Sequence, residues 1–465
     1  MRYLSTRGDA PVLDFEDTVM AGLARDGGLY VPETFPRLTP AEIAAFAGLP
    51  YEEVAYRVMR PFVGGFGDEA LRAVIDRAYA VFRHPARAPL VQTGPADWIL
   101  ELHHGPTLAF KDFAMQAVAG FFETILARRG GRVTIVCATS GDTGSAAMEA
   151  FRGREGCDLF VLYPHGRISE VQRRQMTTPA EANVHALAVE GTFDDCQAIV
   201  KAMFTDHAFR DEMRLGAVNS INWGRVLAQV VYYFTAGVAL GAPARPVSFS
   251  VPTGNFGDIL AGEVARRMGL PVSTLVIATN ENDILHRTLE TGVSEARGVA
   301  PTVAPSMDIQ VSSNFERLLF DLFGRDPAAT AAAMAEQKAT GRFALPQGAR
   351  ERLQGDWASH ASHRAETLET IRRLRHQTGM VIDTHTAIGV NAAHACRRST
   401  AEPMVTLATA HAAKFPNAVA EATGETPALP VHLADLYDRP ERATRVPADL
   451  AAVQETLRAR AAIAA

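Results

Sequence analysis

Short apolar runs alternate with amphipathic segments along most of the chain after about residue 90. The runs are rich in valine, isoleucine, leucine and aromatic residues, which is typical of buried strands. They occupy residues 98–102, 132–138, 158–164, 247–252, 274–280 and 404–408. Helical spacing fills most of the intervals between them. This alternation predicts an α/β region in which parallel strands are covered by helices on both faces.

The same pattern divides the chain into three parts. Residues 1–90 are predicted to form a mostly helical N-terminal domain, which ends near the Pro/Ala/Gly stretch HPARAPLVQTGPAD. Residues 91–430 form the α/β region, which includes a charged helical insertion at about 326–379. Residues 431–465 form a C-terminal segment with a weak alanine-rich helix. A chain of 465 residues is also too long for one typical core.

Composition describes an ordinary soluble globular protein, with 47% hydrophobic and 21% charged residues. The net charge of −6 argues against nucleic acid or an anionic membrane as the main partner. The most apolar stretch, residues 230–240, is too short to span a bilayer, which takes about 20 residues. The four cysteines show no CxxC spacing, and the N-terminus shows no secretory signal or transit peptide. We therefore expect a cytoplasmic protein with unpaired thiols.

Lysine is rare in this chain, and one lysine stands in an unusual position. Only four of the 46 basic residues are lysines, and Lys111 begins a predicted helix that is apolar nearly all round. Burial and the positive end of the helix both lower the pKa of this amine. A neutral amine can form a Schiff base with a carbonyl cofactor, whereas arginine keeps its proton. The alternative is a snorkelling lysine that pairs with Asp112.

The other lysines are less suited to this chemistry. Lys201 and Lys338 lie in mixed helical segments and are expected at the surface. Lys414 is a second candidate for the Schiff base, in a less helical context.

Two turns that are rich in glycine and hydroxyl groups each join a predicted strand to a predicted helix. The first is Thr253-Gly254-Asn255-Phe256-Gly257-Asp258, and the second is Thr139-Ser140-Gly141-Asp142-Thr143-Gly144-Ser145-Ala146. Free backbone N–H groups and a helix N-terminus bind phosphate or carboxylate groups. The first turn is not a Walker A loop, because no GK[ST] follows, and its spacing differs from GxGxxG. For the second turn the alternative is an ordinary helix start that is capped by Asp142 or Ser140.

A third cluster of polar residues is the run NSINWGR, with Asn219, Ser220 and Arg225 as candidates. A guanidinium binds phosphate through two parallel hydrogen bonds, which gives this cluster a use as an anion site. An isolated arginine would otherwise form a surface salt bridge.

Two other kinds of catalytic site are not expected. The histidines His103, His104, His385 and His411 lie near other candidates, but no HExxH or Cys/His ligand spacing is present. We therefore expect no metal. The absence of a GxSxG motif argues against a serine hydrolase.

Several of these segments together resemble one known family. The motifs HHGPTLAFKD, ATSGDTGSAA, NSINWGR, VPTGNFGDILAG and ATAHAAKFP occur in order after an N-terminal DGGLYVPE, and they resemble the threonine synthase family over essentially the whole chain. The resemblance implies a pyridoxal 5'-phosphate enzyme of fold type II, the tryptophan synthase β-like architecture. This fold has two α/β subdomains with the cofactor between them, here after a helical N-terminal domain. The family converts O-phospho-L-homoserine and water into L-threonine and phosphate.

The resemblance also implies roles for individual residues. Lys111 would form the Schiff base with the cofactor, and Thr409 would contact the pyridine nitrogen. Asp142 stands where relatives often carry an asparagine beside the 3-hydroxyl of the cofactor ring. The cofactor phosphate would be held by Gly254, Asn255, Phe256, Gly257 and Asp258. The substrate carboxylate would be held by Ser140 and Thr143, and the substrate phosphate by Asn219, Ser220 and Arg225.

Other functions remain open at this point. A phospho-lyase on the same scaffold, which releases 2-oxobutyrate, ammonia and phosphate, would need the same anion sites. A serine/threonine dehydratase would have no use for Arg225 and its polar neighbours. A non-catalytic relative that only binds the cofactor or an amino acid would not need every candidate catalytic group. We expect a monomer or a weak homodimer.

Overall fold

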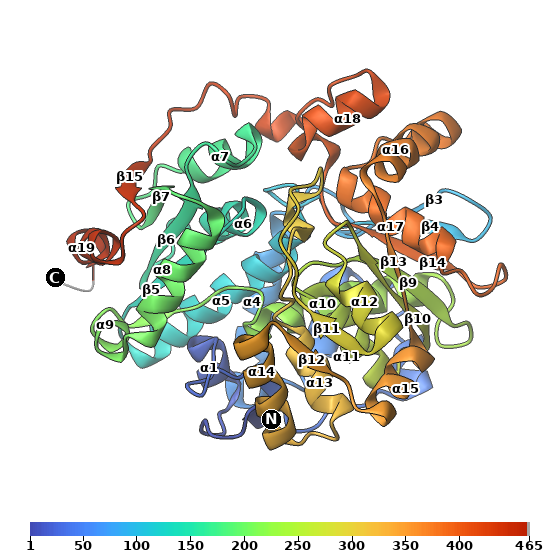
Figure 1. Cartoon of the computed structure of the whole chain (residues 1–465), viewed down its shortest axis with the longest axis horizontal. Coiled ribbons are helices and arrows are strands. Elements are labelled where there is room, and N and C mark those ends of the chain that lie inside the picture. The colour runs from blue at the N-terminus through green and yellow to red at the C-terminus, as the bar shows by residue number, and fades with distance from the viewer. Residues whose placement is uncertain (463–465) are drawn as a thin grey trace.

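Two mainly parallel sheets, each covered by helices, form the two halves of the molecule (Figure 1). The computed structural model describes residues 1–462. Within this range no helix is both long and apolar enough to cross a membrane. The fold class predicted from the alternating pattern is confirmed.

The larger sheet has six strands in the order β13-β10-β9-β14-β4-β3. All neighbours are parallel except β3, which runs antiparallel to β4. The strands are β3 (Leu90–Gln92), β4 (Asp97–Glu101), β9 (Val247–Pro252), β10 (Val272–Thr279), β13 (Trp357–Ala361) and β14 (Met404–Ala408). Side chains alternate along β10: Leu275 and Ile277 belong to the central core, and Val276 and Ala278 pack in a second cluster with helix α17 (Thr384–Ala395). Both faces are therefore covered.

The smaller sheet has five parallel strands in the order β15-β7-β6-β5-β8. They are β5 (Val133–Ala138), β6 (Cys157–Pro164), β7 (Val184–Glu190), β8 (Leu215–Gly216) and β15 (Thr444–Pro447). The helices around it are α6 (Asp142–Phe151), α7 (Glu170–Thr177), α8 (Phe193–Thr205), α9 (His207–Glu212) and α19 (Leu450–Arg460). Strand β6 is buried along its whole length, as a central parallel strand requires.

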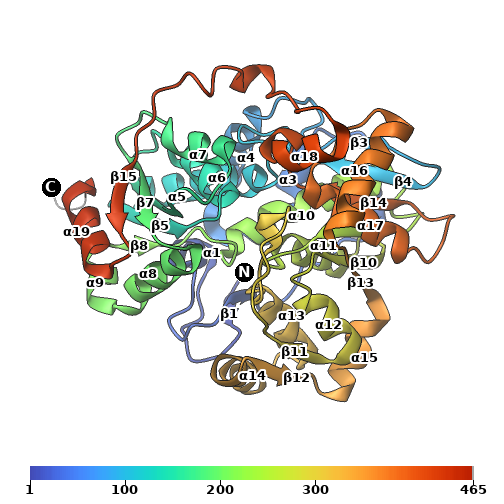
Figure 2. The ribbon, with the colours of Figure 1, turned by 45° about the horizontal axis from the view of Figure 1, so that its top comes forward.

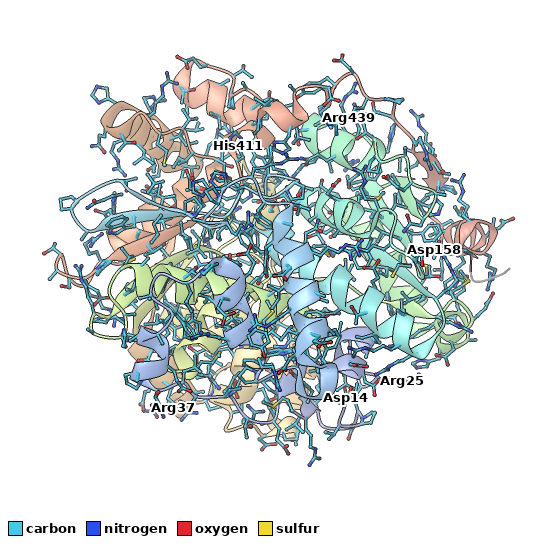
Figure 3. The ribbon with its side chains drawn as sticks, turned by 180° about the vertical axis from the view of Figure 1, so that it is seen from behind. Asp14, Arg25, Arg37, Asp158, His411 and Arg439 are labelled. Atoms are coloured by element: carbon cyan, nitrogen blue, oxygen red, sulfur yellow. The ribbon has the colours of Figure 1, made fainter. Side chains whose placement is uncertain are left out.

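The N-terminal part packs against the central helices from behind (Figure 3). It contains β1 (Tyr3–Ser5), β2 (Tyr30–Pro32), α1 (Phe15–Ala21), α2 (Pro40–Ala44), α3 (Tyr51–Met59), η1 (Gly64–Phe66) and α4 (Asp68–Ala80). The central helices are α5 (Lys111–Arg129), α10 (Trp223–Ala239) and α11 (Gly257–Arg267). Helix α5 contacts α1, α4, α6 and α10, so it is buried on nearly every side. The sequence favours the end of α5 at this point. Arg128 and Arg129 in the last turn interact favourably with the negative end of the helix dipole, and Gly130 follows with a positive φ.

The segment 326–379 differs from the helical insertion that we expected. It holds α14 (Pro327–Thr340), α15 (Gln347–Asp356) and α16 (Arg364–Thr378), but also β12 (Arg342–Ala344) and β13. Strand β13 forms an edge of the larger sheet, and β12 pairs with β11 (Val293–Glu295). The strand WASHA escaped prediction because an edge strand is only partly buried and therefore carries polar residues.

The C-terminal segment joins the two halves. After α18 (Pro416–Thr423) and η4 (Val431–Leu433) the chain crosses to the smaller half, where β15 and α19 lie (Figure 2). Strand β15 pairs in parallel with β7, and α19 packs on α8. The helix that we expected near the C-terminus is confirmed, but the strand before it was missed. The remaining elements are α12 (Ile284–Thr291), α13 (Phe315–Leu322), η2 (Pro305–Met307) and η3 (Ala412–Lys414). The division of the chain at residues 90 and 430 stays a prediction.

Candidate active site

A cavity of about 310 Å³ is lined by strand ends, helix starts and loops from both halves. All the site residues that were predicted from the sequence line it: Lys111, Ser140, Asp142, Thr143, Asn219, Ser220, Arg225, Gly254, Asn255, Phe256, Gly257, Asp258 and Thr409. They come from segments far apart in the chain. Their convergence on one cavity is a finding, whereas their individual roles stay predictions.

Lys111 is the first residue of α5 and reaches into this cavity. Its side chain is 14% exposed, and Nζ lies 3.6 Å from Asp142 Oδ2. Burial lowers the pKa of Lys111, the charge of Asp142 opposes this effect, and the charges of Arg225 and Lys414 reinforce it. The net result is a lowered pKa, as the sequence predicted.

Asp112, the alternative partner of Lys111, is occupied elsewhere. It accepts hydrogen bonds from the backbone N–H of Thr107 at 2.8 Å and from the Thr107 hydroxyl at 2.6 Å. Burial raises the pKa of this carboxyl to about 7, although the Thr107 hydrogen bonds lower it. The snorkelling interpretation of Lys111 is therefore wrong.

The turn at 254–258 gives close access to backbone at the start of α11. A Cβ atom on Gly254 would lie 2.7 Å from the carbonyl oxygen of Ser306, so only glycine fits there. Phe256 adopts the left-handed conformation with φ 63°, and its buried ring stacks on Trp357. No side chain caps the first N–H groups of α11, which suits an anion.

The side chain of Asp258 is engaged by two tyrosines and does not contribute to an anion site at the start of α11. Its Oδ1 accepts from the hydroxyls of Tyr232 at 2.5 Å and Tyr233 at 3.0 Å. Burial raises its pKa to about 7, against the lowering effect of the tyrosine hydrogen bonds and of Lys111. We therefore infer that Asp258 can contribute to phosphate binding only through its backbone N–H.

The turn at 139–146 is organised by the side chain of its first residue, Thr139, to which the sequence assigned no role of its own. Thr139 Oγ1 accepts from the N–H groups of Gly141 and Gly144, each at 2.9 Å. Neither Asp142 nor Ser140 is the N-cap of α6, so that alternative is wrong. The partly exposed side chains of Ser140 and Thr143 line the cavity.

Arg225 is buried without a counterion. Its residue is 2% exposed, Nη1 donates to the carbonyl oxygen of Val218 at 3.2 Å, and Nε has no partner within residues 1–462. No carboxylate of the described residues forms a salt bridge with it. Burial lowers its pKa to about 10, although Cys137 and Tyr232 oppose this effect. The interpretation of Arg225 as a surface residue in a salt bridge is therefore wrong. A buried cation that lines a cavity is suited to bind an anion.

Three family models together cover most of the chain. The model "Threonine synthase N terminus" matches residues 2–79, "Pyridoxal-phosphate dependent enzyme" matches 84–349, and "Threonine synthase, C-terminal" matches 386–457. The chain is 56% identical to the threonine synthase of Pseudomonas aeruginosa, over 98% of this chain and 97% of that protein. The chain belongs to the threonine synthase family.

Solved structures agree with this membership. A pyridoxal-phosphate-bound threonine synthase from Brucella melitensis has a TM-score of 0.96 and 53% identity, over 99% of this chain and 100% of that chain. The yeast threonine synthase has a TM-score of 0.93 and 40% identity, over 98% of each chain. This threonine synthase family member is thus a fold type II, pyridoxal-phosphate-dependent lyase. The phospho-lyase alternative is not favoured.

The cavity of this threonine synthase family member fits the cofactor. The buried Lys111 amine suits an aldehyde, and the close turn at Gly254 with the uncapped start of α11 suits a phosphate. Thr409 lies directly after β14, and its carbonyl oxygen accepts from the N–H of Phe110 at 2.9 Å. This hydrogen bond fixes Thr409 next to the start of α5.

Sequence reasoning gave no role to His385, which also lines the cavity. Its Nδ1 lies 2.7 Å from Asp383 Oδ2, and its Nε2 accepts from the N–H of Ser306 at 3.3 Å. This pattern assigns the proton to Nδ1. Ser306 in turn donates its hydroxyl to Asp142 Oδ2 at 3.2 Å, so His385 supports the loop that contacts Asp142. The available signal was the run DTHT at the start of α17.

A second cavity of about 820 Å³ adjoins the first. The two share the lining residues Ala138, Gln197, Asn219, Ile221 and Ser313. The second cavity therefore borders the first on the side of Asn219.

Proposed function

We propose that the protein converts O-phospho-L-homoserine and water into L-threonine and phosphate, as the last step of threonine biosynthesis. The single observation that carries this proposal is Arg225, a buried guanidinium without a counterion in the cavity that also contains Lys111. An amine suited to the cofactor and a separate cation suited to a second phosphate are what a phosphorylated amino-acid substrate requires.

Lys111 has two tasks in this proposal. It binds the cofactor aldehyde, and after the substrate has displaced it, its amine takes the proton from the substrate Cα. When bound, pyridoxal phosphate supplies the electron sink for the charge that this proton leaves behind. The lowered pKa of Lys111 favours the neutral base that both tasks need.

The remaining residues bind and orient. Arg225 would hold the substrate phosphate together with the side-chain N–H groups of Asn219 and the hydroxyl of Ser220, which line the same cavity. Charge that gathers on the departing phosphate would be stabilised there. Ser140 and Thr143 would hold the substrate carboxylate near the start of α6. Thr409 would contact the ring nitrogen of the cofactor, whose phosphate would bind to Gly254, Asn255, Phe256, Gly257 and Asp258 through backbone groups.

We also propose a cytoplasmic location and a monomeric or weakly dimeric state. All four cysteines are unpaired, which is typical of a reducing compartment. The large exposed hydrophobic residues are scattered in sequence: Val12, Val81, Val299, Val311, Val431 and Tyr437.

Product analysis tests the proposed reaction. The purified protein with bound cofactor is incubated with O-phospho-L-homoserine, and threonine, phosphate, ammonia and 2-oxobutyrate are measured. We expect one threonine for each phosphate. Phosphate accompanied by 2-oxobutyrate and ammonia would instead identify the phospho-lyase, and no phosphate release would refute both.

A further inference from the structure

Lys414 has no part in the proposed reaction, although its side chain is fully buried. It ends the short helix η3 and is 0% exposed, whereas Lys201 and Lys338 lie at the surface as expected. Its Nζ lies 2.7 Å from Asp142 Oδ1 and donates to the carbonyl oxygen of Thr107 at 2.8 Å. Because a buried ammonium is costly unless it is paired, Asp142 is its necessary partner.

The carboxylate of Asp142 is shared between two lysines, one on each oxygen. Oδ1 accepts from Gln172 Nε2 at 2.9 Å and pairs with Lys414. Oδ2 lies 3.6 Å from Lys111 Nζ and accepts from Ser306 Oγ at 3.2 Å. Burial raises the pKa of Asp142, but the charges of Lys414 and Lys111 outweigh burial and hold the pKa well below its ordinary value. Asp142 is therefore an ionised group at the centre of this cluster.

We propose that Lys414 is a positioning residue for Lys111: it balances the charge of Asp142 at one oxygen and leaves the other oxygen as a fixed acceptor beside the Lys111 amine. The inference rests on the proposed role of Lys111 in binding the cofactor aldehyde. In that reaction a C=N bond forms, and the carbonyl oxygen leaves as water with both amine protons. Only the neutral amine reacts, so a lone carboxylate at this position would hold Lys111 in its unreactive form.

The charges around Lys111 give this effect its direction. Four ionisable groups face Lys111 from the elements around it, namely Asp142 on α6, Arg225 on α10, Asp258 on α11 and Lys414 on η3. Removing Lys414 removes one cation and also leaves Asp142 unbalanced. Both changes favour the ammonium form of Lys111, and an unbalanced carboxylate within about 4–6 Å raises such a pKa by about one unit or more.

The test is the pH dependence of cofactor binding by the full-length protein. The cofactor is removed from the protein and then added back. The rate of the absorbance change that accompanies cofactor binding is recorded over about pH 6–10. For Lys414→Met we expect the midpoint of this rate profile to rise by about one pH unit or more. The carbonyl of Thr107 keeps a donor in this variant, because Gln175 Nε2 also reaches it at 3.1 Å. Lys338→Met, the same change at an exposed position of α14, is the control and should not move the midpoint.

The double variant Asp142→Asn/Lys414→Met separates charge balance from packing. It removes both charges, so its midpoint should return to the wild-type value or fall below it. If Lys414→Met does not fold, the double variant carries the test, and we expect it to fold and to bind with a midpoint no higher than that of the wild type. An unshifted Lys414→Met, or a double variant that is unfolded or shifted like Lys414→Met, overturns the proposal.

Failure of the proposed reaction would look different. If the protein forms no threonine but the variants show the expected midpoints, the proposed reaction is rejected and the role of Lys414 is supported. A Lys111→Ala variant that gives the wild-type absorbance change would refute the assignment of Lys111 as the cofactor-binding lysine. The proposed role of Lys414 would then be refuted as well.

Discussion

Replacing Arg225 by methionine should make the protein more stable and its catalysis much weaker. The two effects have one cause: the Arg225 guanidinium is buried beside the cavity without a carboxylate partner among residues 1–462, and an anion that binds in the cavity would pair with it. Methionine keeps much of the apolar volume of the side chain and removes the charge. A residue that merely packs would change stability and catalysis in the same direction.

The structure gives both magnitudes. Burial lowers the pKa of Arg225 from 12.5 to about 10, which corresponds to a cost of about 3 kcal/mol for the charged form. The variant also leaves the carbonyl of Val218 without the Arg225 donor, at a cost of about 1 kcal/mol. We therefore expect the free energy of unfolding to rise by about 2 kcal/mol. Two charge-assisted hydrogen bonds to phosphate contribute about 3 kcal/mol or more, so kcat/KM should fall by about 100-fold or more.

Two assays check this reasoning. Urea denaturation of the variant and the wild type, with and without inorganic phosphate, gives the free energies of unfolding, and steady-state kinetics with O-phospho-L-homoserine gives kcat/KM. Phosphate at about 100 times its Kd should stabilise the wild type by about 2.7 kcal/mol and the variant far less. Arg37→Met, at an exposed arginine that is labelled in Figure 3, is the control and should change neither quantity. An Arg225→Met protein that is less stable than the wild type but keeps its kcat/KM would refute the assignment.

Three further changes test other parts of the site. Lys111→Ala should abolish both turnover and the absorbance of the bound cofactor, and retention of either in a spectrum and a product assay would contradict the assignment. Gly254→Ala should weaken cofactor binding by about tenfold or more because its Cβ would meet the Ser306 carbonyl at 2.7 Å, whereas Gly257→Ala, whose nearest contact is 3.5 Å, should bind normally in a fluorescence titration. Asp258 has a pKa raised to about 7, so its folded-state proton stabilises the protein at low pH, and this stabilisation is lost between about pH 4 and pH 7. Asp258→Asn should flatten this slope and be more stable near neutral pH by about 2–4 kcal/mol, and equal slopes in urea denaturation at several pH values would contradict the shift.

The sequence predicted most of the buried strands but missed one of them, β7, and the strands at the sheet edges. Every strand predicted from an apolar run is present, because a strand that is buried on both faces is mostly apolar. Strand β7 was missed because alternate positions carry alanine, which favours strands weakly. Strands β13 and β15 lie at sheet edges, where polar residues weaken the signal.

The site residues were predictable from their motifs, but their electrostatic partners were not. Nothing in the motif NSINWGR distinguishes a surface arginine from a buried one, and only the packing of α10 places Arg225 in the interior. The motif that contains Lys414 likewise suggested an alternative Schiff-base lysine. Its contact with Asp142 gives it a structural reason to be there, and this contact depends on the approach of η3 to α6.

The balance of charge in the cavity connects these observations to the proposed substrate. Arg225 and Lys414 are buried cations, Lys111 has a lowered pKa, and Asp142 is the carboxylate that is held ionised among them. Asp258 keeps a proton up to about pH 7, so it adds little negative charge under acidic and neutral conditions. The Arg225 guanidinium is therefore a cation that lines the cavity without a carboxylate partner among residues 1–462, although the whole chain carries a charge of −6. A cation in this position suits an anionic ligand, and the phosphate group of the proposed substrate would supply the opposite charge.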